Sequence, residues 1–229
     1  MIAGLQKMTL LDYPGKVACT VFLQGCNYRC PFCHNSELLP RKGEEFMTEE
    51  EFLSFLKKRQ GLLDAVCVSG GEPTLCKDLP RLLKDIKDLG FLVKLDTNGS
   101  DPAMLKALVA EGLVDYVAMD IKNCREKYAE TVGIPGFDTV PVEESVRLLQ
   151  TGGVDFEFRT TVVKEFHTAQ DFVSIGQWLA GSPRYFLQQF VDSGDLVGHG
   201  CTAVEPLQLK EFADLTRPFF GSVELRGIN

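Results

Sequence analysis

Three cysteines stand close together near the start of the chain. Cys26, Cys30 and Cys33 fall within eight residues, in the segment CNYRCPFC. Three thiolates in one tight loop suit three corners of a cubane iron–sulfur cluster, whose fourth iron then has no protein ligand. An iron with an open position is a binding site for a substrate. The spacing therefore predicts a reactive iron–sulfur cluster.

Thiolates bind zinc as readily as iron, so two other metal groups fit the same loop. With His34, the three cysteines make a zinc set of three thiolates and one imidazole, and Cys30 to His34 matches the Cys-x-x-Cys-His pattern of haem attachment. Covalent haem of this kind belongs to exported proteins, and no export signal is visible. A closed zinc site would not require the motifs that follow later strands. We favour the cluster, and both alternatives stay open.

Polar motifs follow the next three expected strands. They are Ser69-Gly70-Gly71-Glu72-Pro73, Leu95-Asp96-Thr97-Asn98-Gly99 and Met119-Asp120-Ile121-Lys122. Glycines allow the backbone to approach a ligand, and Glu72 can hold a cationic group. Each motif has a plainer explanation, as a turn, a local side-chain cap or a surface ion pair. Their recurrence after successive strands indicates one shared pocket.

The elements that must position these motifs alternate between strand and helix. Apolar runs predict strands at 17–23, 65–68, 91–95, 116–121, 156–163, 185–191 and 223–225. The first helix is expected to begin at Thr48, with a capping box to Glu51, and to end near Gly61. Further helices are expected over 79–89, 142–150 and 205–216, and two others should start near 101 and 168. About six such units predict one α/β domain over residues 1–229, with a parallel sheet and functional groups at the carboxyl ends of its strands.

The composition is that of an ordinary globular protein. Of its 229 residues, 45% are hydrophobic, and 24 basic against 32 acidic residues give a net charge of −8, which disfavours contact with nucleic acid. No apolar run reaches membrane-spanning length. We expect a cytoplasmic protein with no nucleic-acid and no membrane partner. The remaining cysteines are expected to be mostly inert, and they are Cys19, Cys67, Cys76, Cys124 and Cys201. His167 and His199 are expected to face solvent.

The motifs resemble those of the radical S-adenosylmethionine (SAM) superfamily. The resemblance rests on Cys-x-x-x-Cys-x-x-Cys, with Phe32 before the last cysteine, and on the later Gly-Gly-Glu. Residues 4–16, 24–26 and 33–35 look like the anaerobic ribonucleoside-triphosphate reductase activating proteins. The Asp-Thr-Asn-Gly and Asp-Ile-Lys segments are also similar to pyruvate formate-lyase activating enzymes. The resemblance covers most of residues 1–165, and the chain after Phe166 gives almost no functional signal.

The resemblance implies a fold, a cofactor set and a group of contacts. The fold is a partial (β/α)6 barrel of the radical SAM type. The cofactors are one 4Fe–4S cluster on Cys26, Cys30 and Cys33, and SAM with a monovalent cation alongside. The implied SAM contacts are Phe32 near the adenine, Gly70, Gly71 and Glu72 at the methionine amino group, and Asp96, Thr97, Asp120, Lys122 and Arg159 around the methionine and ribose.

The implied activity is reductive cleavage of SAM and formation of a glycyl radical on a partner enzyme, with a flavodoxin or ferredoxin-type electron donor. The expected partner is anaerobic ribonucleoside-triphosphate reductase. The alternative is a radical SAM enzyme that acts on another glycyl-radical enzyme or on a small molecule. One departure bears on this choice: formate-lyase activases carry a cofactor-contacting histidine late in the barrel, where this chain has Gln188 and Gln189. That difference argues against pyruvate formate-lyase as the partner.

Overall fold

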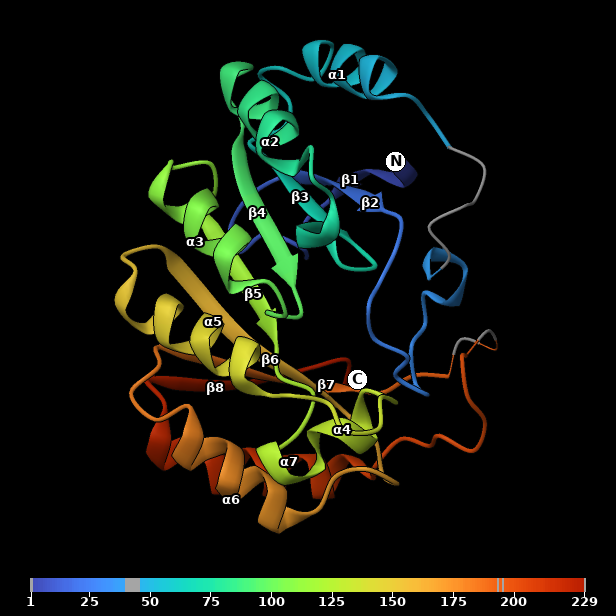
Figure 1. Cartoon of the computed structure of the whole chain (residues 1–229), viewed down its shortest axis with the longest axis vertical. Helices are drawn as coiled ribbons and strands as arrows, with labels where there is room; N and C mark the ends of the chain where they lie inside the picture. The colour runs from blue at the N-terminus through green and yellow to red at the C-terminus, as the bar shows by residue number, and fades with distance from the viewer. Residues whose placement is uncertain (1, 40–45, 193, 195, 229) are drawn as a thin grey trace. The chain divides into compact units, whose positions relative to one another are not determined.

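The computed structural model describes residues 2–39, 46–192, 194 and 196–228 (Figure 1). They form two compact units, each assembled from separate chain segments. Unit 1 takes its described residues from Met1–Asn27, Glu37–Ala118 and Gly152–Asp155. Unit 2 takes them from Tyr28–Ser36, Met119–Thr151 and Phe156–Asn229. The expectation of a single domain over the whole chain stays a prediction.

Unit 1 is built on strands that run parallel from the second one onward. The strands are β1 (Ile2–Thr9), β2 (Ala18–Leu23), β3 (Ala65–Gly70), β4 (Leu92–Thr97) and the first three residues of β5 (Tyr116–Asp120), in that order along the sheet. β2 pairs with β3 and β3 with β4 in parallel, whereas β1 is antiparallel to β2. The sequence did not predict β1, because its middle residues are exposed and lack the apolar run that marks the other strands.

The helices of unit 1 are α1 (Glu49–Lys57), α2 (Leu79–Asp88) and α3 (Pro102–Ala110). The predicted capping box is confirmed: the Glu51 N–H donates to Thr48 Oγ1 at 3.2 Å, and the Thr48 N–H donates to the Glu51 carboxylate at 2.8 Å. α1 ends at Lys57, earlier than expected. α2 packs on β4, and its Leu79, Leu83 and Ile86 are fully buried.

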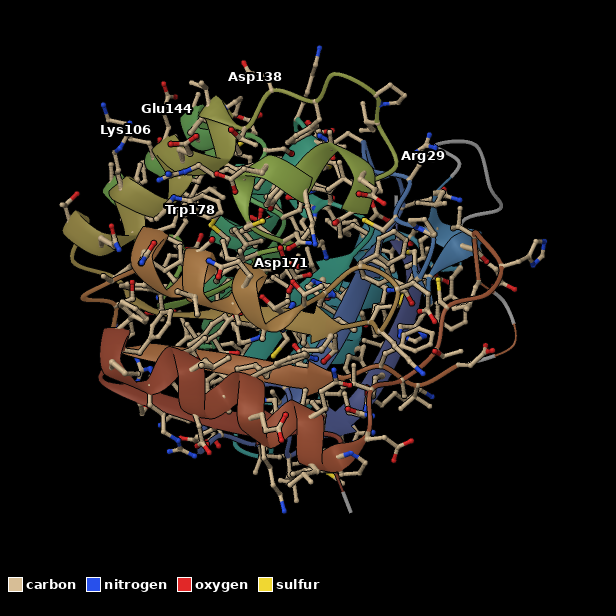
Figure 2. The ribbon with its side chains drawn as sticks, turned by 90° about the horizontal axis from the view of Figure 1, so that it is seen from below. Arg29, Lys106, Asp138, Glu144, Asp171 and Trp178 are labelled. Carbon is tan, nitrogen blue, oxygen red and sulfur yellow. The ribbon has the colours of Figure 1, made fainter. Side chains whose placement is uncertain are left out.

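Unit 2 repeats the same architecture. Its strands are the last two residues of β5, then β6 (Asp155–Val162), β7 (Arg184–Gln189) and β8 (Ser222–Arg226), with parallel pairing from β6 to β8. Its helices are α4 (Tyr128–Thr131), α5 (Val140–Thr151), α6 (Ala169–Trp178) and α7 (Pro206–Thr216). Phe172 of α6 stacks on Phe212 of α7 with ring centroids 4.6 Å apart. Figure 2 shows Asp171 and Trp178 near opposite ends of α6.

Both units are therefore α/β structures with mainly parallel strands, as the alternation of strands and helices predicted. Parallel strands place their carboxyl ends at one edge of a sheet. The end of β2 leads to Cys26, the end of β3 to the Gly-Gly-Glu turn and the end of β4 to Asn98 and Gly99. Among the described residues, none of the helices is both long and apolar enough to cross a membrane.

Candidate functional site

Glu72 follows β3 in unit 1 and has only 1% of its surface exposed. Its carboxylate accepts hydrogen bonds from the Thr74 N–H at 3.1 Å and hydroxyl at 2.5 Å, the Thr97 hydroxyl at 2.7 Å and the Asn98 N–H at 2.5 Å. Burial raises the pKa of Glu72, although these bonds act in the opposite direction. The side chain thus ties the turn after β3 to the turn after β4, so two predicted motifs are brought together.

The Gly-Gly pair of the same turn lies against the start of the cysteine loop. The Gly71 N–H donates to the Leu23 carbonyl at 2.9 Å, and the Glu72 N–H donates to the Gly25 carbonyl at 2.8 Å. A Cβ on Gly71 would lie 2.3 Å from the Gly25 oxygen and 3.2 Å from Cys26 Cβ. Glycine is therefore required here by the close approach of two backbones.

Asp96 at the end of β4 is held by two side chains. Lys94 forms an ion pair with one carboxylate oxygen, and the Ser69 hydroxyl donates to the other at 2.9 Å. The Lys94 side chain is only 2% exposed, and it leaves the same face of the strand as Asp96 because the two are two residues apart. Sequence reasoning missed Lys94. A lysine in a buried strand, at this spacing from a candidate ligand, was a readable signal.

In unit 2, Asp120 is shared between Lys122 and Arg159. Lys122 Nζ donates to one carboxylate oxygen at 2.8 Å, and Arg159 Nε donates to the other. Burial alone would raise the pKa of Asp120, but the charges of Arg159 and Lys122 outweigh it and hold the pKa below its usual range. The three side chains are 15–29% exposed, so they form a partly enclosed cluster rather than a surface ion pair.

The electrostatics of Lys122 connect this cluster to the cysteine loop. Burial acts to lower the pKa of Lys122, but Asp120 and, to a lesser degree, Cys30 outweigh burial and raise it. Lys122 therefore stays protonated, and it lies within electrostatic reach of the Cys30 thiol. Lys122 and Arg159 place two positive charges beside Asp120, and positive charges suit an anionic group on a ligand.

Main-chain bonds hold the part of the cysteine loop that belongs to unit 2. The Arg29 N–H donates to the Val132 carbonyl at 2.9 Å, and the Gly198 N–H donates to the Pro31 carbonyl at 2.8 Å. A Cβ on Gly198 would lie 2.7 Å from Pro31 Cβ. This part of the loop is therefore hydrogen-bonded to segments that are far from it in the sequence.

Aromatic contacts support the same loop. Phe32 is 4% exposed, and its ring centroid lies 5.8 Å from that of Phe166. His34 stacks on Phe190 at 5.3 Å, and burial lowers the pKa of His34. Phe190 and Gly198 belong to the region after Phe166, for which sequence patterns predicted almost no function. Their support of the loop could not be read from one sequence, because it depends on long-range packing.

The donor chemistry fits an iron–sulfur cluster. Cys26 in unit 1 and Cys30 and Cys33 in unit 2 are not joined in disulfides. Within the ranges that the structure describes, no three His, Cys, Asp or Glu side chains are grouped as one metal ion would require. A cubane makes a different demand, because each thiolate binds a different iron. Three cysteines outside disulfides, on one loop that the backbone approaches closely at Gly71 and Gly198, are compatible with that group.

Two expectations about histidine have different outcomes. His199 is exposed, as expected. The expectation for His167 is wrong: it is 2% exposed, because both ring nitrogens bond to main-chain groups and the ring stacks on Phe172 at 5.7 Å. A histidine between Phe166 and a helix cap gave no sequence pattern that distinguishes a buried ring from an exposed one.

The cysteines outside the loop behave as packing residues. Four are buried and Cys76 is half-buried. Burial raises the pKa of Cys19 and of Cys67 to about 12, so both stay protonated. A thiol in that state is a poor nucleophile and a poor metal ligand, which agrees with the expectation that most of these cysteines are inert.

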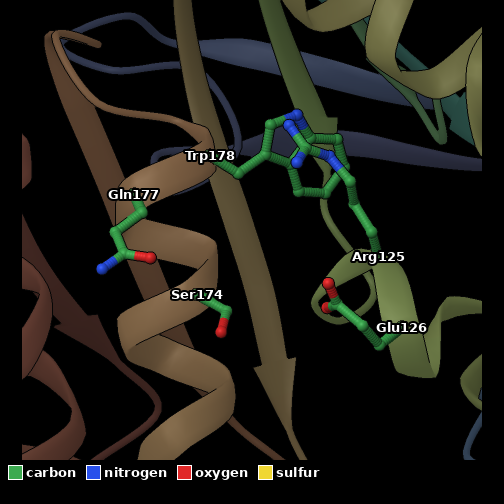
Figure 3. Close-up of a pocket in the computed structure, with 5 residues that line it drawn as sticks. All are labelled: Arg125, Glu126, Ser174, Gln177 and Trp178. Atoms are coloured by element: carbon green, nitrogen blue, oxygen red, sulfur yellow. The ribbon is translucent and has the colours of Figure 1, made fainter.

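A polar surface groove lies elsewhere in unit 2 (Figure 3). It is lined by Arg125, Glu126, Ser174, Gln177 and Trp178, and the Arg125 guanidinium lies 5.0 Å from the centre of the Trp178 ring. None of the predicted ligand or cofactor residues lines it. The groove is therefore separate from the predicted chemistry.

Comparisons with known proteins agree with these motifs. Residues 20–179 match the family described as "Radical SAM superfamily". The chain is 32% identical to a Methanocaldococcus jannaschii protein named "Putative glycyl-radical enzyme activating enzyme", over 100% of this chain and 97% of that protein. It is also 32% identical to the pyruvate formate-lyase-activating enzyme of Clostridium pasteurianum, over 60% of each chain.

Solved structures extend the comparison to the fold. Streptococcus suis SuiB, crystallised with SAM bound, superposes with a TM-score of 0.72 at 12% identity over 92% of this chain. The chain spans about half the length of SuiB, 52%. This similarity confirms the predicted α/β fold of the partial-barrel, radical SAM type.

Replacing Lys94 by Met should lower the free energy of unfolding by roughly 3 kcal/mol, because the Asp96 carboxylate loses its ion-pair partner in an enclosed position. Urea unfolding of the apoprotein measures this change. The control is the double variant Lys94→Met, Asp96→Leu, which removes both charges and should recover most of the loss. A double variant as unstable as the single one would contradict the ion-pair explanation.

Replacing Gly133 by Ala should disturb the cysteine loop, because the new Cβ would lie 2.4 Å from the Arg29 carbonyl oxygen. The matched control is Gly136→Ala, since both glycines have φ near +70° but Gly136 has no atom within 4 Å of the added Cβ. Backbone strain should lower the free energy of unfolding of both variants by about 1 kcal/mol. The clash with Arg29 should lower that of Gly133→Ala by roughly 1–3 kcal/mol more.

Iron and sulfide content after anaerobic reconstitution is the second measurement on this pair. Gly133→Ala should incorporate less of both than Gly136→Ala. Equal content and equal stability in the two variants would show that the approach of residue 133 to Arg29 does not support the loop.

Proposed function

Because this chain belongs to the radical SAM superfamily, we propose that it is a glycyl-radical enzyme activase. It binds one 4Fe–4S cluster through Cys26, Cys30 and Cys33, together with SAM. The observation that carries the proposal is the end-to-end alignment with the M. jannaschii protein, whose name is that of such an activating enzyme. The proposed partner is anaerobic ribonucleoside-triphosphate reductase, which the motifs at 4–16, 24–26 and 33–35 support.

The protein's contribution to this activity is to bind, orient and shield. The reduced cluster, when bound, supplies one electron to break the carbon–sulfur bond of SAM, which yields methionine and a 5′-deoxyadenosyl radical that takes a hydrogen atom from glycine. Everything else rests on the side chains and turns of this chain, which set where SAM lies and which hydrogen the radical meets.

Unit 1 contributes contacts for the methionine end of SAM in this proposal. The turn at Gly70 and Gly71 offers backbone without side chains, and Glu72 holds that turn against the next one. Asp96 presents a carboxylate to the methionine ammonium, with its orientation set by Lys94 and Ser69. Thr97 acts through its bond to Glu72.

Two cations of unit 2 are the proposed contacts for the SAM carboxylate. Lys122 and Arg159, with Asp120 between them, provide the positive charge that a carboxylate needs. Phe32, fixed against Phe166, offers an apolar surface to the adenine. The monovalent cation and the flavodoxin or ferredoxin-type electron donor stay predictions.

Gln189 at the end of β7 has a buried oxygen that a ligand bound in unit 2 could satisfy. Its amide N–H donates to the Val204 carbonyl at 2.7 Å, but its buried oxygen has no hydrogen-bond partner among the described residues. A buried acceptor without a donor is costly, and a bound ligand with a hydroxyl or amino group would satisfy it.

Pyruvate formate-lyase is the second candidate partner. The C. pasteurianum relative supports it, with 32% identity over 60% of each chain. Gln188 and Gln189, where the formate-lyase activases carry a histidine, argue against it. A direct comparison of the two glycyl-radical enzymes as substrates decides between them.

Replacing Cys30 by Ala should abolish cluster assembly and SAM cleavage, because three thiolates are the smallest protein ligand set that holds the cluster. Cys76→Ala is the matched control, since Cys76 is a free, half-buried thiol with no proposed role. Iron content and 5′-deoxyadenosine yield measure both variants. Iron retained at the wild-type level in Cys30→Ala would contradict the assignment.

Electron paramagnetic resonance tests the activity itself. The anaerobically reconstituted, reduced protein is mixed with SAM and either anaerobic ribonucleotide reductase or pyruvate formate-lyase, and 5′-deoxyadenosine is quantified in parallel. We expect a glycyl radical on the reductase. A radical on the lyase alone would reassign the partner, whereas 5′-deoxyadenosine without any glycyl radical would reject the activase proposal and leave a small-molecule substrate.

A further inference from the structure

His167 joins two turns of unit 2 through its ring nitrogens. Nε2 lies 2.9 Å from the Lys122 carbonyl oxygen, and Nδ1 lies 3.1 Å from both the main-chain nitrogen and the carbonyl oxygen of Val163. Burial lowers the pKa of His167 and outweighs the opposite effect of the Lys122 and Val163 carbonyls, which favours the neutral ring. Nε2 has only the Lys122 carbonyl beside it, and a carbonyl accepts but does not donate, whereas Nδ1 can either accept from the Val163 N–H or donate to the Val163 carbonyl. We therefore place the single ring proton on Nε2, the tautomer in which both ring nitrogens have a hydrogen-bond partner and Nδ1 accepts from the Val163 N–H.

The bond to Lys122 fixes the main chain that carries a proposed SAM contact. The Lys122 carbonyl accepts from His167, while its N–H makes a longer bond, 3.4 Å, to the Tyr128 hydroxyl. The Lys122 side chain reaches Asp120 at 2.8 Å. A shift of this main chain would move the ammonium away from Asp120.

Asn123 reinforces the same connection. Its side chain is fully buried, and its amide donates to the Phe166 carbonyl and to the Thr131 hydroxyl, each at 2.9 Å. The residues after β5 and after β6 are thus cross-linked by two side chains, His167 and Asn123. Phe166, held by Asn123, is also the residue that packs on Phe32.

The start of α6 does not need the bond between His167 and Lys122. Thr168 and Asp171 hold the start of this helix together, since the Thr168 N–H and hydroxyl each donate to the Asp171 carboxylate at 2.8 Å. The turn from β6 to α6 is closed by the bond between His167 and Val163. The two bonds of the ring therefore have separable consequences: one closes a local turn, and the other holds Lys122.

We propose that His167 is a positioning residue, which holds Lys122 in place for SAM through the bond from Nε2–H to the Lys122 carbonyl. This inference rests on the proposed function, because it requires SAM at Lys122. It assigns a role to a side chain that does not itself touch the cofactor.

Two amide substitutions separate the two bonds. In His167→Gln the amide nitrogen can occupy the place of Nε2 and donate to Lys122, whereas in His167→Asn the amide oxygen can occupy the place of Nδ1 and accept only from Val163. We expect His167→Asn to weaken SAM binding about tenfold, the effect of one lost hydrogen bond. His167→Gln should stay near the wild-type affinity. Equilibrium titration with SAM measures both, after iron content and unfolding temperature have been recorded.

Steady-state cleavage of SAM gives a second readout. His167→Asn should raise KM for SAM and leave kcat nearly unchanged, because the defect lies in binding. In a Lys122→Met background, His167→Asn should have no further effect on SAM affinity, since the residue through which it acts is gone. A further tenfold loss in that background would overturn the proposal.

Other outcomes are equally decisive. Equal affinity in the Asn and Gln variants, or tighter binding by the Asn variant, would show that His167 only closes its local turn. An Asn variant that fails to fold while the Gln variant folds would also overturn the proposal, because the Lys122 bond would then serve folding. A wild-type protein that neither binds SAM nor forms 5′-deoxyadenosine would instead reject the proposed function.

Discussion

The loop that carries Cys26, Cys30 and Cys33 is neither helix nor strand, so its main-chain polar groups must find partners outside regular structure. The structure meets this constraint with turns from distant parts of the sequence. Glu72 donates its N–H to Gly25 in unit 1, while in unit 2 Arg29 donates to Val132 and Pro31 accepts from Gly198. Close backbone approach then dictates glycine at Gly71 and Gly198, where a Cβ would meet an atom within 3 Å.

The desolvation cost of the carboxylates near the strand ends is offset in two different ways, one at Glu72 and one at Asp120. Glu72 is surrounded by hydroxyl and N–H donors, which offset only part of the effect of burial, so its pKa is still raised. Asp120 is paired with two cations, which hold its pKa below the usual range. The first arrangement suits a rigid joint between turns, and the second keeps fixed charges available to a ligand.

Much of this could be predicted from the sequence where the signal is local. The cysteine spacing, the Gly-Gly-Glu turn, the Thr48 cap and most strands are patterns within a few residues. Lys94 was within reach of the same reasoning, because period two places it beside Asp96. β1 was not predicted, because pairing with β2, rather than its own composition, makes it a strand. The contacts of Gly133 and Gly198 with the cysteine loop were not predicted, because these glycines lie far from the loop in the sequence.

His167 shows why a ligand site needs more than the residues that touch the ligand. The pKa of His167 in the folded protein lies below the ordinary value of about 6.5, so protonation of the ring is disfavoured in the native state. The contribution of this histidine to stability is therefore complete above pH 6.5 and is lost as the pH falls below that value. Asp120 stays ionised and Lys122 stays protonated through the neutral range. The charges and tautomer that place Lys122 are therefore constant near neutral pH. A ring that must remain neutral in order to accept from Val163 is held neutral by the same burial that brings it to Lys122.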